Sequence, residues 1–600
     1  MPNLYDLPRD ERAITVTAKV HRPVLYDVAN HVVTARFDGK GGVEQFALLG
    51  TDIKRAEENF YQLAINGQEL DCFGDKRVAM LGRCQVISYD HPAADITVLL
   101  FLDDRSPAVF QEFVIRAKET LSGRVSFNQI GCFLQPEPMG DGVWRLTETE
   151  NRPVWCFVTP PVTLAMHNSM VMEEFHLPAG ACAHLRRVIT LSCPETAPFD
   201  PVAAYRRFDE HRAEAAVFLS EFQPPAGCDP ALYCSAYNAA LSNYKERGAF
   251  RAFVAGCNYL SPVRTYFRDS YWTVLCMYAH RPERVREQIL TLAAGIQEDG
   301  TCPSAVKEDF TIYWGNHYDS PSFLAMMLLD YITITGDRTV LQEPWREGTI
   351  LDAAEFVIAR LAQYADETGL IVKAGPFNVL DWADNVNRTG YVTYDEVLYA
   401  RANFALSRLT TGEKSMRYYA TFCRVREAIN RLLWDEEKGY YVDYKDGDFT
   451  EDHLAIDTVV AVLFGIADDT RARRLLGQME ALLETQNNPA FHGEEFGVAC
   501  VFPPYKRLED VHFKSTEPYF YHNGSDWPYW SAVYAYAKSL YGMDPIYPLT
   551  RWFRYGLENG HYTPLEFFSS VRRPGSALQA WSSTAAFACD HLGQPFFLSE

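Results

Sequence analysis

The chain has 600 residues and a net charge of -22, from 56 Lys and Arg against 78 Asp and Glu. This charge would repel the phosphates of nucleic acid and the anionic face of a membrane, so we expect neither as a partner. The N-terminal segment MPNLYDLPRDERAITV carries charges where a secretory signal needs an apolar run, and no stretch of about 18 uncharged apolar residues follows. We therefore expect a soluble, cytoplasmic protein.

The cysteines and the aromatic residues narrow the chemistry further. The 14 cysteines are scattered singly, with no C-x-x-C pair and no metal-like spacing, so we expect neither a disulfide framework nor a zinc site. Aromatic residues make up 14% of the chain, and many stand beside acidic residues or glycine. Part of this content fills a large core. The remainder is typical of clefts in which a ring stacks on the apolar face of a sugar.

Residues 13 to 195 alternate apolar and polar side chains in short runs, such as ITVTAKVHRPVLYDV, DITVLLFL and AVFQEFVIRA. Alternation with period two, interrupted by Gly, Asp, Asn and Pro, predicts antiparallel strands. From about residue 200 the spacing becomes helical, and PPAGCDP at 224–230 indicates a boundary. We expect an N-terminal β-sandwich over 1–198 and a helical linker over 199–230.

Beyond residue 230 apolar side chains recur with period 3.6, as in VREQILTLAAGIQ, SFLAMMLLDYITIT and EVLYARANFALSRL. About 370 residues hold roughly twelve helices at ordinary helix and loop lengths. Six helical hairpins closed into a ring would use all of them, so we expect an (α/α)6 barrel over 231–600 in a multidomain α and β chain. An α-solenoid is the alternative, disfavoured because no fixed-period repeat is visible.

Four segments between the predicted helices combine acidic and aromatic side chains. They are FRDSYW at 267–272, YWGNHYD at 313–319, LDWADNVNRTG at 380–390, and the region from FHGEEFG at 491–497 to TPLEFF at 563–568. Any one of these carboxylates could simply cap a helix or face solvent. Their common placement between helices favours a shared site, and cleavage of a glycosidic bond requires two carboxyl groups on either side of the anomeric carbon.

The four segments, over about 250–590, resemble the six-hairpin glycosidases, particularly the amylo-α-1,6-glucosidase type of glycogen debranching enzyme and glycoside hydrolase family 63. The resemblance implies an inverting glycoside hydrolase with an (α/α)6 barrel. Arg268 and Asp269 are similar to the pair that binds the terminal sugar, although Tyr266 and Phe267 stand where the family has Trp-Gly. The resemblance also implies a set of sugar-binding side chains: Arg268, Asp269, Trp272, Trp314, Tyr318, Asp319, Asp381, Trp382, Glu396, His522, Asn523, Trp527, Gln579 and Trp581.

The same resemblance implies the two catalytic carboxyl groups. Asp384 in DWADN matches the general acid, as does the later Asp of the similar Asp-Trp-Asn-Asp segment in the cellobiose phosphorylase family, and Asp381 would then hold sugar hydroxyls. Glu566 in TPLEFF, followed by a glycine and Gln-Ala-Trp-Ser, matches the general base. The alternative candidates for the base are Glu494, Glu495 and Glu517.

In this mechanism a desolvated, protonated Asp384 donates to the glycosidic oxygen while Glu566 activates water, with the two carboxyl groups roughly 6.5–9.5 Å apart. We expect no metal and no organic cofactor, because proton transfer and positioning supply the catalysis. The substrate would be a small oligosaccharide or glycoside cleaved from its end, and the resemblance alone favours an α-glucoside. An inverting disaccharide phosphorylase and a non-catalytic carbohydrate-binding protein are the alternatives; an epimerase or lyase is disfavoured because the 15 His show no convincing pair. The sequence does not determine the sugar, the anomeric configuration or whether the chain forms an oligomer.

Overall fold

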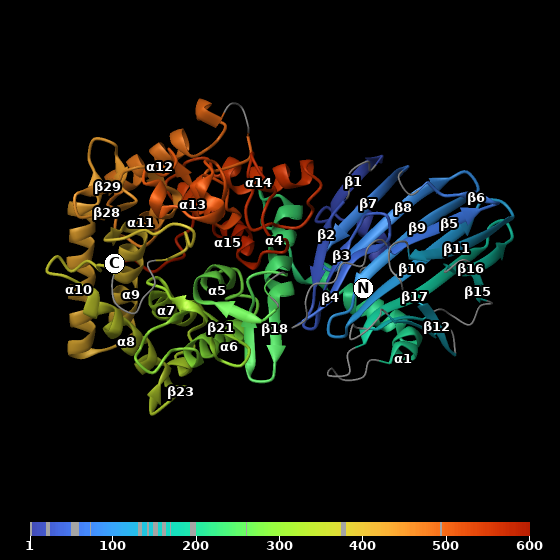
Figure 1. Cartoon of the computed structure of the whole chain (residues 1–600), viewed down its shortest axis with the longest axis horizontal. Helices are drawn as coiled ribbons and strands as arrows, with labels where there is room; N and C mark the ends of the chain where they lie inside the picture. The colour runs from blue at the N-terminus through green and yellow to red at the C-terminus, as the bar shows by residue number, and fades with distance from the viewer. Residues whose placement is uncertain are drawn as a thin grey trace. The chain divides into compact units, whose positions relative to one another are not determined.

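A computed structural model shows two compact units, residues 1–243 with 557–563 and residues 244–556 with 564–600 (Figure 1). The structure describes residues 3–19, 24–49, 59–71, 74–129, 135–140, 143–147, 154–158, 164–167, 170–192, 200–257, 259, 261–373, 380–491 and 495–599. The sequence places boundaries at 198 and 230. The packing instead assigns the helices between residues 201 and 243 to the first unit, because they lie against its strands.

The first unit is built on antiparallel sheets, as the alternating sequence predicts. A nine-stranded sheet has the order β1-β7-β8-β9-β10-β17-β14-β13-β12, a five-stranded sheet β15-β16-β11-β5-β6, and a small sheet β2-β3-β4. The strands are β1 (Ile14–Lys19), β2 (Tyr26–Ala29), β3 (Val33–Phe37), β4 (Val43–Leu48), β5 (Asn59–Ile65), β6 (Gln68–Glu69), β7 (Asp75–Leu81), β8 (Cys84–His91), β9 (Ala94–Leu102), β10 (Ala108–Ala117), β11 (Leu121–Gln129), β12 (Gln135–Gly140), β13 (Val143–Thr147), β14 (Val154–Val158), β15 (Leu164–His167), β16 (Met170–Leu177) and β17 (Cys182–Ser192). The helices are α1 (Pro201–Arg206), α2 (Phe208–Ala215), α3 (Phe218–Glu221) and α4 (Pro230–Asn243).

Both faces of the nine-stranded sheet are covered. On one face Phe101 and Phe110 are opposite each other in the register of β9 and β10, with ring centroids 4.9 Å apart, and Phe208 of α2 packs edge-on against both. On the other face Phe113 of β10 meets Tyr61 of the five-stranded sheet, 4.7 Å between centroids. Because side chains of a strand alternate between faces, even and odd positions of β10 serve different layers.

The second unit is mainly helical. Its helices are α5 (Phe267–Val274), α6 (Pro282–Ala294), α7 (Ser320–Thr335), α8 (Ile350–Leu361), α9 (Thr393–Leu409), α10 (Gly412–Leu432), α11 (Val460–Leu463), α12 (Asp469–Leu482), α13 (Pro528–Leu540), α14 (Ile546–Glu558, its last two residues in the first unit) and α15 (Thr584–His591). The 3-10 turns η4 (Ile456–Val459) and η9 (Ala580–Ser583) precede α11 and α15. Short strands lie in the connections, among them β20 (Arg264–Tyr266), β21 (Pro303–Lys307), β22 (Ile312–Asn316), β25 (Tyr391–Val392), β28 (Tyr444–Asp446) and β29 (Phe449–Glu451).

The helices of the second unit differ in how they are buried. In α7 every residue from Ser320 to Ile332 is buried, and α9 is buried along nearly its whole length. In α10 the buried side chains form one stripe that includes Tyr418, Phe422 and Val425. A helix that is apolar all round belongs inside a domain, whereas a single apolar stripe covers a core from outside. These patterns therefore predict inner and outer helices.

The inner elements pack in a cyclic order. Helix α5 lies against α7, α7 against α9, α9 against η4, η4 against α13, and α13 against η9, which returns to α5. Hydrogen bonds close the last step, because the hydroxyl groups of Ser583 and Thr584 donate to the carbonyl oxygens of Thr273 and Trp272, over 3.1 and 3.2 Å. The two ends of the helical region thus meet.

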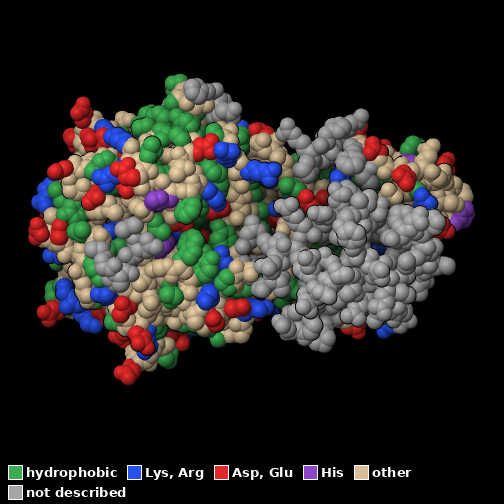
Figure 2. Space-filling view, in the orientation of Figure 1, with side chains coloured by type: hydrophobic (Ala, Val, Ile, Leu, Met, Phe, Trp, Pro, Cys, Tyr) green, Lys and Arg blue, Asp and Glu red, His purple; other side chains and the backbone are tan. Residues whose placement is uncertain are grey.

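The surface of the second unit is mixed in charge. On the face drawn at the left of Figure 2, acidic and basic side chains are interspersed rather than gathered into one patch. None of the helices in the described part of the chain is long and apolar enough to pass through a bilayer.

Candidate functional site

The N-terminal ends of the inner helices carry many of the predicted site residues. Arg268 and Asp269 lie in the first turn of α5, and Asp319 immediately precedes α7. Trp527 precedes α13, and Gln579 precedes η9. Because these elements pack in cyclic order, residues far apart in the sequence come together; Tyr259 and Glu566, which share a hydrogen bond, are 307 positions apart.

An arginine and two carboxylates form the polar part of the site. The Arg268 guanidinium donates to Asp319 Oδ2 over 3.0 Å, and its Nε lies 3.8 Å from Asp269 Oδ2. Burial raises the pKa of Asp269 to about 7, against the attraction of Arg268 and with the charge of Glu566 adding to the rise. Asp269 Oδ2, Asp319 Oδ1 and both ring nitrogens of His317 are buried and have no hydrogen-bond partner among the described residues. Buried polar groups normally have partners, so these atoms are suited to bind the hydroxyl groups of a ligand.

Aromatic rings form the wall beside these groups. Trp527 lies edge-on to Trp382 and Trp581, with centroids 5.7 and 5.8 Å apart, and stacks on His522 at 4.8 Å. Trp581 stacks in turn on Tyr529, 4.4 Å between centroids. The indole N–H of Trp581 and the hydroxyl of Tyr529 have no partner among the described residues. The rings therefore offer an apolar surface with polar atoms at its edge, as sugar recognition requires.

Asp384 lies in the loop between η3 (Ala362–Tyr364) and α9, with its side chain 12% exposed. Its Oδ1 accepts from Asn385 Nδ2 over 3.2 Å and lies 3.8 Å from His522 Nδ1. Burial raises the pKa of Asp384 to about 7; the charge of Arg268 opposes this rise and the charge of Glu566 adds to it. Near neutral pH a large fraction of Asp384 is therefore protonated and able to donate.

Glu566 is buried and has hydrogen-bond donors at both oxygens. Its Oε1 accepts from the hydroxyl groups of Tyr259 and Tyr521 over 3.2 and 3.5 Å, and its Oε2 accepts from the Ser576 backbone N–H over 3.1 Å. A Cβ at Gly575 would lie 2.8 Å from Oε2, so the glycine makes room for the carboxylate. These contacts fix the orientation of Glu566.

Tyr259 and Tyr521 were missed by the sequence analysis. Burial raises the pKa of both hydroxyl groups well above the ordinary value, and the charges of Asp384 and Glu566 raise each further. Asp384 and Glu566 thus belong to one electrostatic cluster with the two tyrosines. The position of Tyr521 next to His522 in YHNG was a usable signal, whereas Tyr259 in CNYLSP offers none.

Asp381 has a different environment from the one expected. Its Oδ1 accepts from the Ala383 backbone N–H over 2.9 Å and from Arg388, and its Oδ2 accepts from Lys373 over 2.6 Å and from Arg388 over 3.1 Å. A carboxylate has about four acceptor positions, and all four are used. Asp381 is therefore occupied in anchoring its own loop rather than available for sugar hydroxyls.

Two more of the predicted residues are also tied to the backbone. Asn523 accepts from the Tyr505 N–H over 3.0 Å and donates to the Ser515 carbonyl over 2.9 Å, which fixes two loops behind His522. Glu396 in the first turn of α9 accepts from the Ile371 N–H over 3.0 Å. Burial raises the pKa of Glu396 well above its usual range.

Trp272 and Gln579 lie fully buried at the site. The indole N–H of Trp272 and both amide atoms of Gln579 have no partner among the described residues. A Cβ at Gly256 would lie 2.6 Å from Gln579 Oε1, so this approach depends on glycine. Gln579 thus retains both a donor and an acceptor for a ligand.

Trp314 and Tyr318 are separated by the structure although they are close in the sequence. Trp314 in β22 is 51% exposed, has a positive φ of 62°, and stacks on Tyr313 at 5.8 Å. Tyr318 is buried, with the Lys373 ammonium 5.5 Å from its ring centroid. Trp314 therefore presents a ring to solvent, and Tyr318 belongs to the interior.

The alternative candidates for the base lie elsewhere. Glu517 is 40% exposed and pairs with Arg572 over 2.8 Å at the surface. Glu495 is exposed, and Glu494 lies outside the described residues. Of the described candidates, Glu566 is the one whose charge acts on Asp384.

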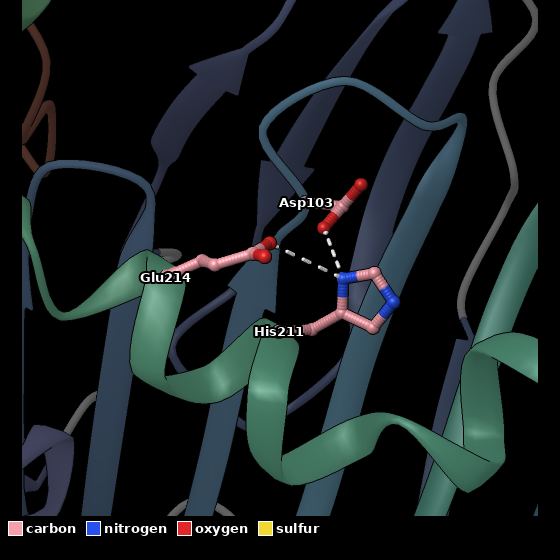
Figure 3. A group of neighbouring side chains, drawn as sticks. All are labelled: Asp103, His211 and Glu214. Carbon is pink, nitrogen blue, oxygen red and sulfur yellow. Dashed lines mark ion pairs between the residues drawn. The ribbon is translucent and has the colours of Figure 1, made fainter.

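A histidine and two carboxylates, residue types that can bind a metal, lie close together in the first unit (Figure 3). His211 and Glu214 project from α2, and Asp103 from the loop after β9. His211 Nδ1 lies 2.8 Å from Asp103 Oδ1 and 3.7 Å from Glu214 Oε2. Although burial opposes ionisation, hydrogen bonds from His211 and Ser106 lower the pKa of Asp103 to about 2. The contact between His211 and Asp103 ties α2 to the loop after β9.

The chain shares its fold with two solved structures, which agrees with the predicted resemblance at the level of the fold. A bacterial glucoamylase in complex with acarbose superposes with a TM-score of 0.58 at 11% identity, covering 97% of this chain and 98% of that one. A putative kojibiose phosphorylase from the human microbiome gives a TM-score of 0.54 at 11% identity, covering 97% and 88%. No protein-family model matches the chain, and no curated protein matches it by sequence.

Proposed function

We propose that the chain is an inverting glycoside hydrolase whose site lies at the mouth of an (α/α)6 barrel. The cyclic packing of α5, α7, α9, η4, α13 and η9 supports six inner elements of such a barrel. The amphipathic helices α6, α8, α10, α12 and α14 suit the outer layer. In the first unit, the face-to-face sheets support the predicted β-sandwich.

The observation that carries the proposal is the pairing of Asp384 with Glu566. Asp384 has a pKa of about 7 because it is buried, and Glu566 contributes to that value through its charge. A carboxyl group that is protonated near neutral pH, together with a second one that is surrounded by donors and whose charge acts on the first, has the properties of a general acid and a general base.

The reaction follows from these roles. Asp384 protonates the glycosidic oxygen as the bond from this oxygen to the anomeric carbon breaks, so the leaving group departs as an alcohol. A water molecule attacks the anomeric carbon from the opposite face and gives its proton to Glu566. The product would have the inverted configuration. Arg268, Asp269 and the Trp527 wall would hold the sugar in place for both transfers.

Glucosides are the first substrates to test. The proteins that share the fold are named a glucoamylase and a putative kojibiose phosphorylase, so the assay must distinguish hydrolysis from phosphorolysis. A phosphorylase replaces the base and water by inorganic phosphate. The presence of Glu566, held by Tyr259 and Tyr521, favours water as the nucleophile.

The test is a panel of di- and oligosaccharides followed by proton NMR of the first anomer formed, with and without inorganic phosphate. We expect a free sugar of inverted configuration, loss of turnover in Glu566→Gln and in Asp384→Asn, and no dependence on phosphate. A sugar 1-phosphate would identify a phosphorylase instead. Sugar binding without turnover in the wild type would identify a non-catalytic carbohydrate-binding protein.

A further inference from the structure

A network of buried charges lies beneath the loop that carries Asp384, and Arg388 is at its centre. The Arg388 side chain is fully buried and donates to three carboxylates. Its Nε and Nη2 bind both oxygens of Asp381, and its Nη1 donates to Asp443 Oδ1 and Asp457 Oδ2, each over 2.6 Å. The planar guanidinium therefore ties three separate segments of the chain to one point.

The network also reaches the aromatic wall. Asp457 Oδ2, which accepts a hydrogen bond from Arg388, also accepts one from the Trp382 indole N–H over 2.5 Å. The ring centroid of Trp382 lies 5.1 Å from that of His522, and His522 Nδ1 lies 3.8 Å from Asp384 Oδ1. Arg388 is thus connected to Asp381 directly and, through Asp457, to Trp382 of the aromatic wall.

Arg388 closes the loop on itself. The contact between Asp381 and Arg388 joins positions seven apart, and Asp384 lies between them. The outer side of the loop is held by backbone hydrogen bonds, His512 N–H to the Asn385 carbonyl and Asn387 N–H to the Asp510 carbonyl, both 2.8 Å. A loop closed in this way has few alternative conformations, so the Asp384 carboxyl has a defined position.

We propose that Arg388 is a positioning residue for proton transfer: it holds Asp384 in the geometry for donation without contacting the substrate. The inference rests on the proposed function, because it assumes that Asp384 is the general acid. Misplacing an acid by a fraction of an ångström costs rate in the transition state while the bound sugar is little affected. The loss should therefore fall on kcat rather than KM, and on reactions that need the proton.

Two substrates separate this role from a structural one. A glycoside identified by the substrate panel requires protonation of its leaving oxygen, whereas the corresponding glycosyl fluoride releases fluoride without it. Arg388→Lys keeps a charge but loses the simultaneous contacts. We expect kcat for the glycoside to fall by about 10²-fold, within the usual range for general acid catalysis, and kcat for the fluoride to fall by less than about fivefold. Asp384→Asn should give the same selective pattern.

Arg401→Lys is the matched control, since Arg401 is also buried but pairs with Asp330 over 3.5 Å and donates to the Leu598 carbonyl over 2.6 Å rather than to the Asp384 loop. It should leave the ratio of the two kcat values unchanged. If Arg388→Lys does not fold, Asp457→Asn carries the test, because it weakens the contacts to both Arg388 and Trp382. If Arg388→Lys or Asp457→Asn lowers kcat equally for the glycoside and the fluoride, while Asp384→Asn still lowers kcat for the glycoside selectively, the positioning role alone is overturned. Absence of any glycoside turnover in the wild type would overturn the proposed function as well.

Discussion

Replacing Glu566 by Gln should lower the pKa of Asp384. The charge of Glu566 disfavours a second negative charge nearby and so contributes to the value of about 7, while burial is the larger cause and Arg268 opposes both. The substitution removes one of these effects and retains the size and the buried position of the side chain. Burial continues to keep the pKa of Asp384 above that of an exposed aspartate.

The size of the change follows from the separation that inverting chemistry requires. Two unit charges 6.5–9.5 Å apart interact by about 1.7–2.6 kcal/mol at an effective dielectric constant of roughly 20. One pKa unit corresponds to about 1.4 kcal/mol, so the shift should be roughly 1.3–1.9 units. Asp384 in Glu566→Gln should then titrate between about pH 5 and 6.

Infrared difference titration measures the pKa of Asp384 directly, through the carbonyl band of its protonated carboxyl group. The band that is missing in Asp384→Asn is the band of Asp384. As the proposed acid, Asp384 should also set the alkaline limb of kcat/KM in the wild type: activity should fall as pH rises through about 7, because the acid must be protonated. A pKa of Asp384 that is unchanged or raised in Glu566→Gln would refute the reasoning, since the two groups would not then be neighbours.

Three further predictions follow from single residues. Burial raises the pKa of Asp269 to about 7, so the stability that this carboxyl group contributes is fully present below the unfolded pKa and is lost as pH rises through 7. Asp269→Asn should therefore raise Tm more at pH 8 than at pH 5. An equal change in Tm at both pH values would contradict this. Trp314, which is 51% exposed, should affect longer substrates only: Trp314→Ala should raise their KM about 2- to 10-fold and leave a disaccharide unaffected, as steady-state kinetics would show. Glu517→Gln breaks an exposed ion pair with Arg572 that is worth about 1 kcal/mol at most. Its kcat/KM should therefore stay within about twofold of the wild-type value. A loss of about 10²-fold would make Glu517 the base.

The sequence predicts much of the secondary structure because its signals are local. Alternation in DITVLLFL and AVFQEFVIRA predicts β9 and β10, and the period of 3.6 predicts α7 and α9. Both patterns depend on a few neighbouring residues. The boundary near residue 230 was harder to place, because helical periodicity identifies the buried face of α4 without identifying the core that covers it.

The candidate site was predicted unevenly for a similar reason. The motifs bring Arg268, Asp269, Asp384 and Glu566 into one proposal through resemblance, and the structure places them in one electrostatic cluster. The environment of Asp381 was not predictable, since Lys373 and Arg388 satisfy it through contacts that residue types alone do not reveal.

The order of elements and the residue types able to donate or accept a proton were determined by the sequence by itself. Which carboxyl group is protonated was decided by the tertiary structure, because a pKa depends on burial and on charges that the fold brings near. Tyr259, Asp384 and Glu566 are more than 100 residues apart along the chain, and only the packing of the helices makes them neighbours.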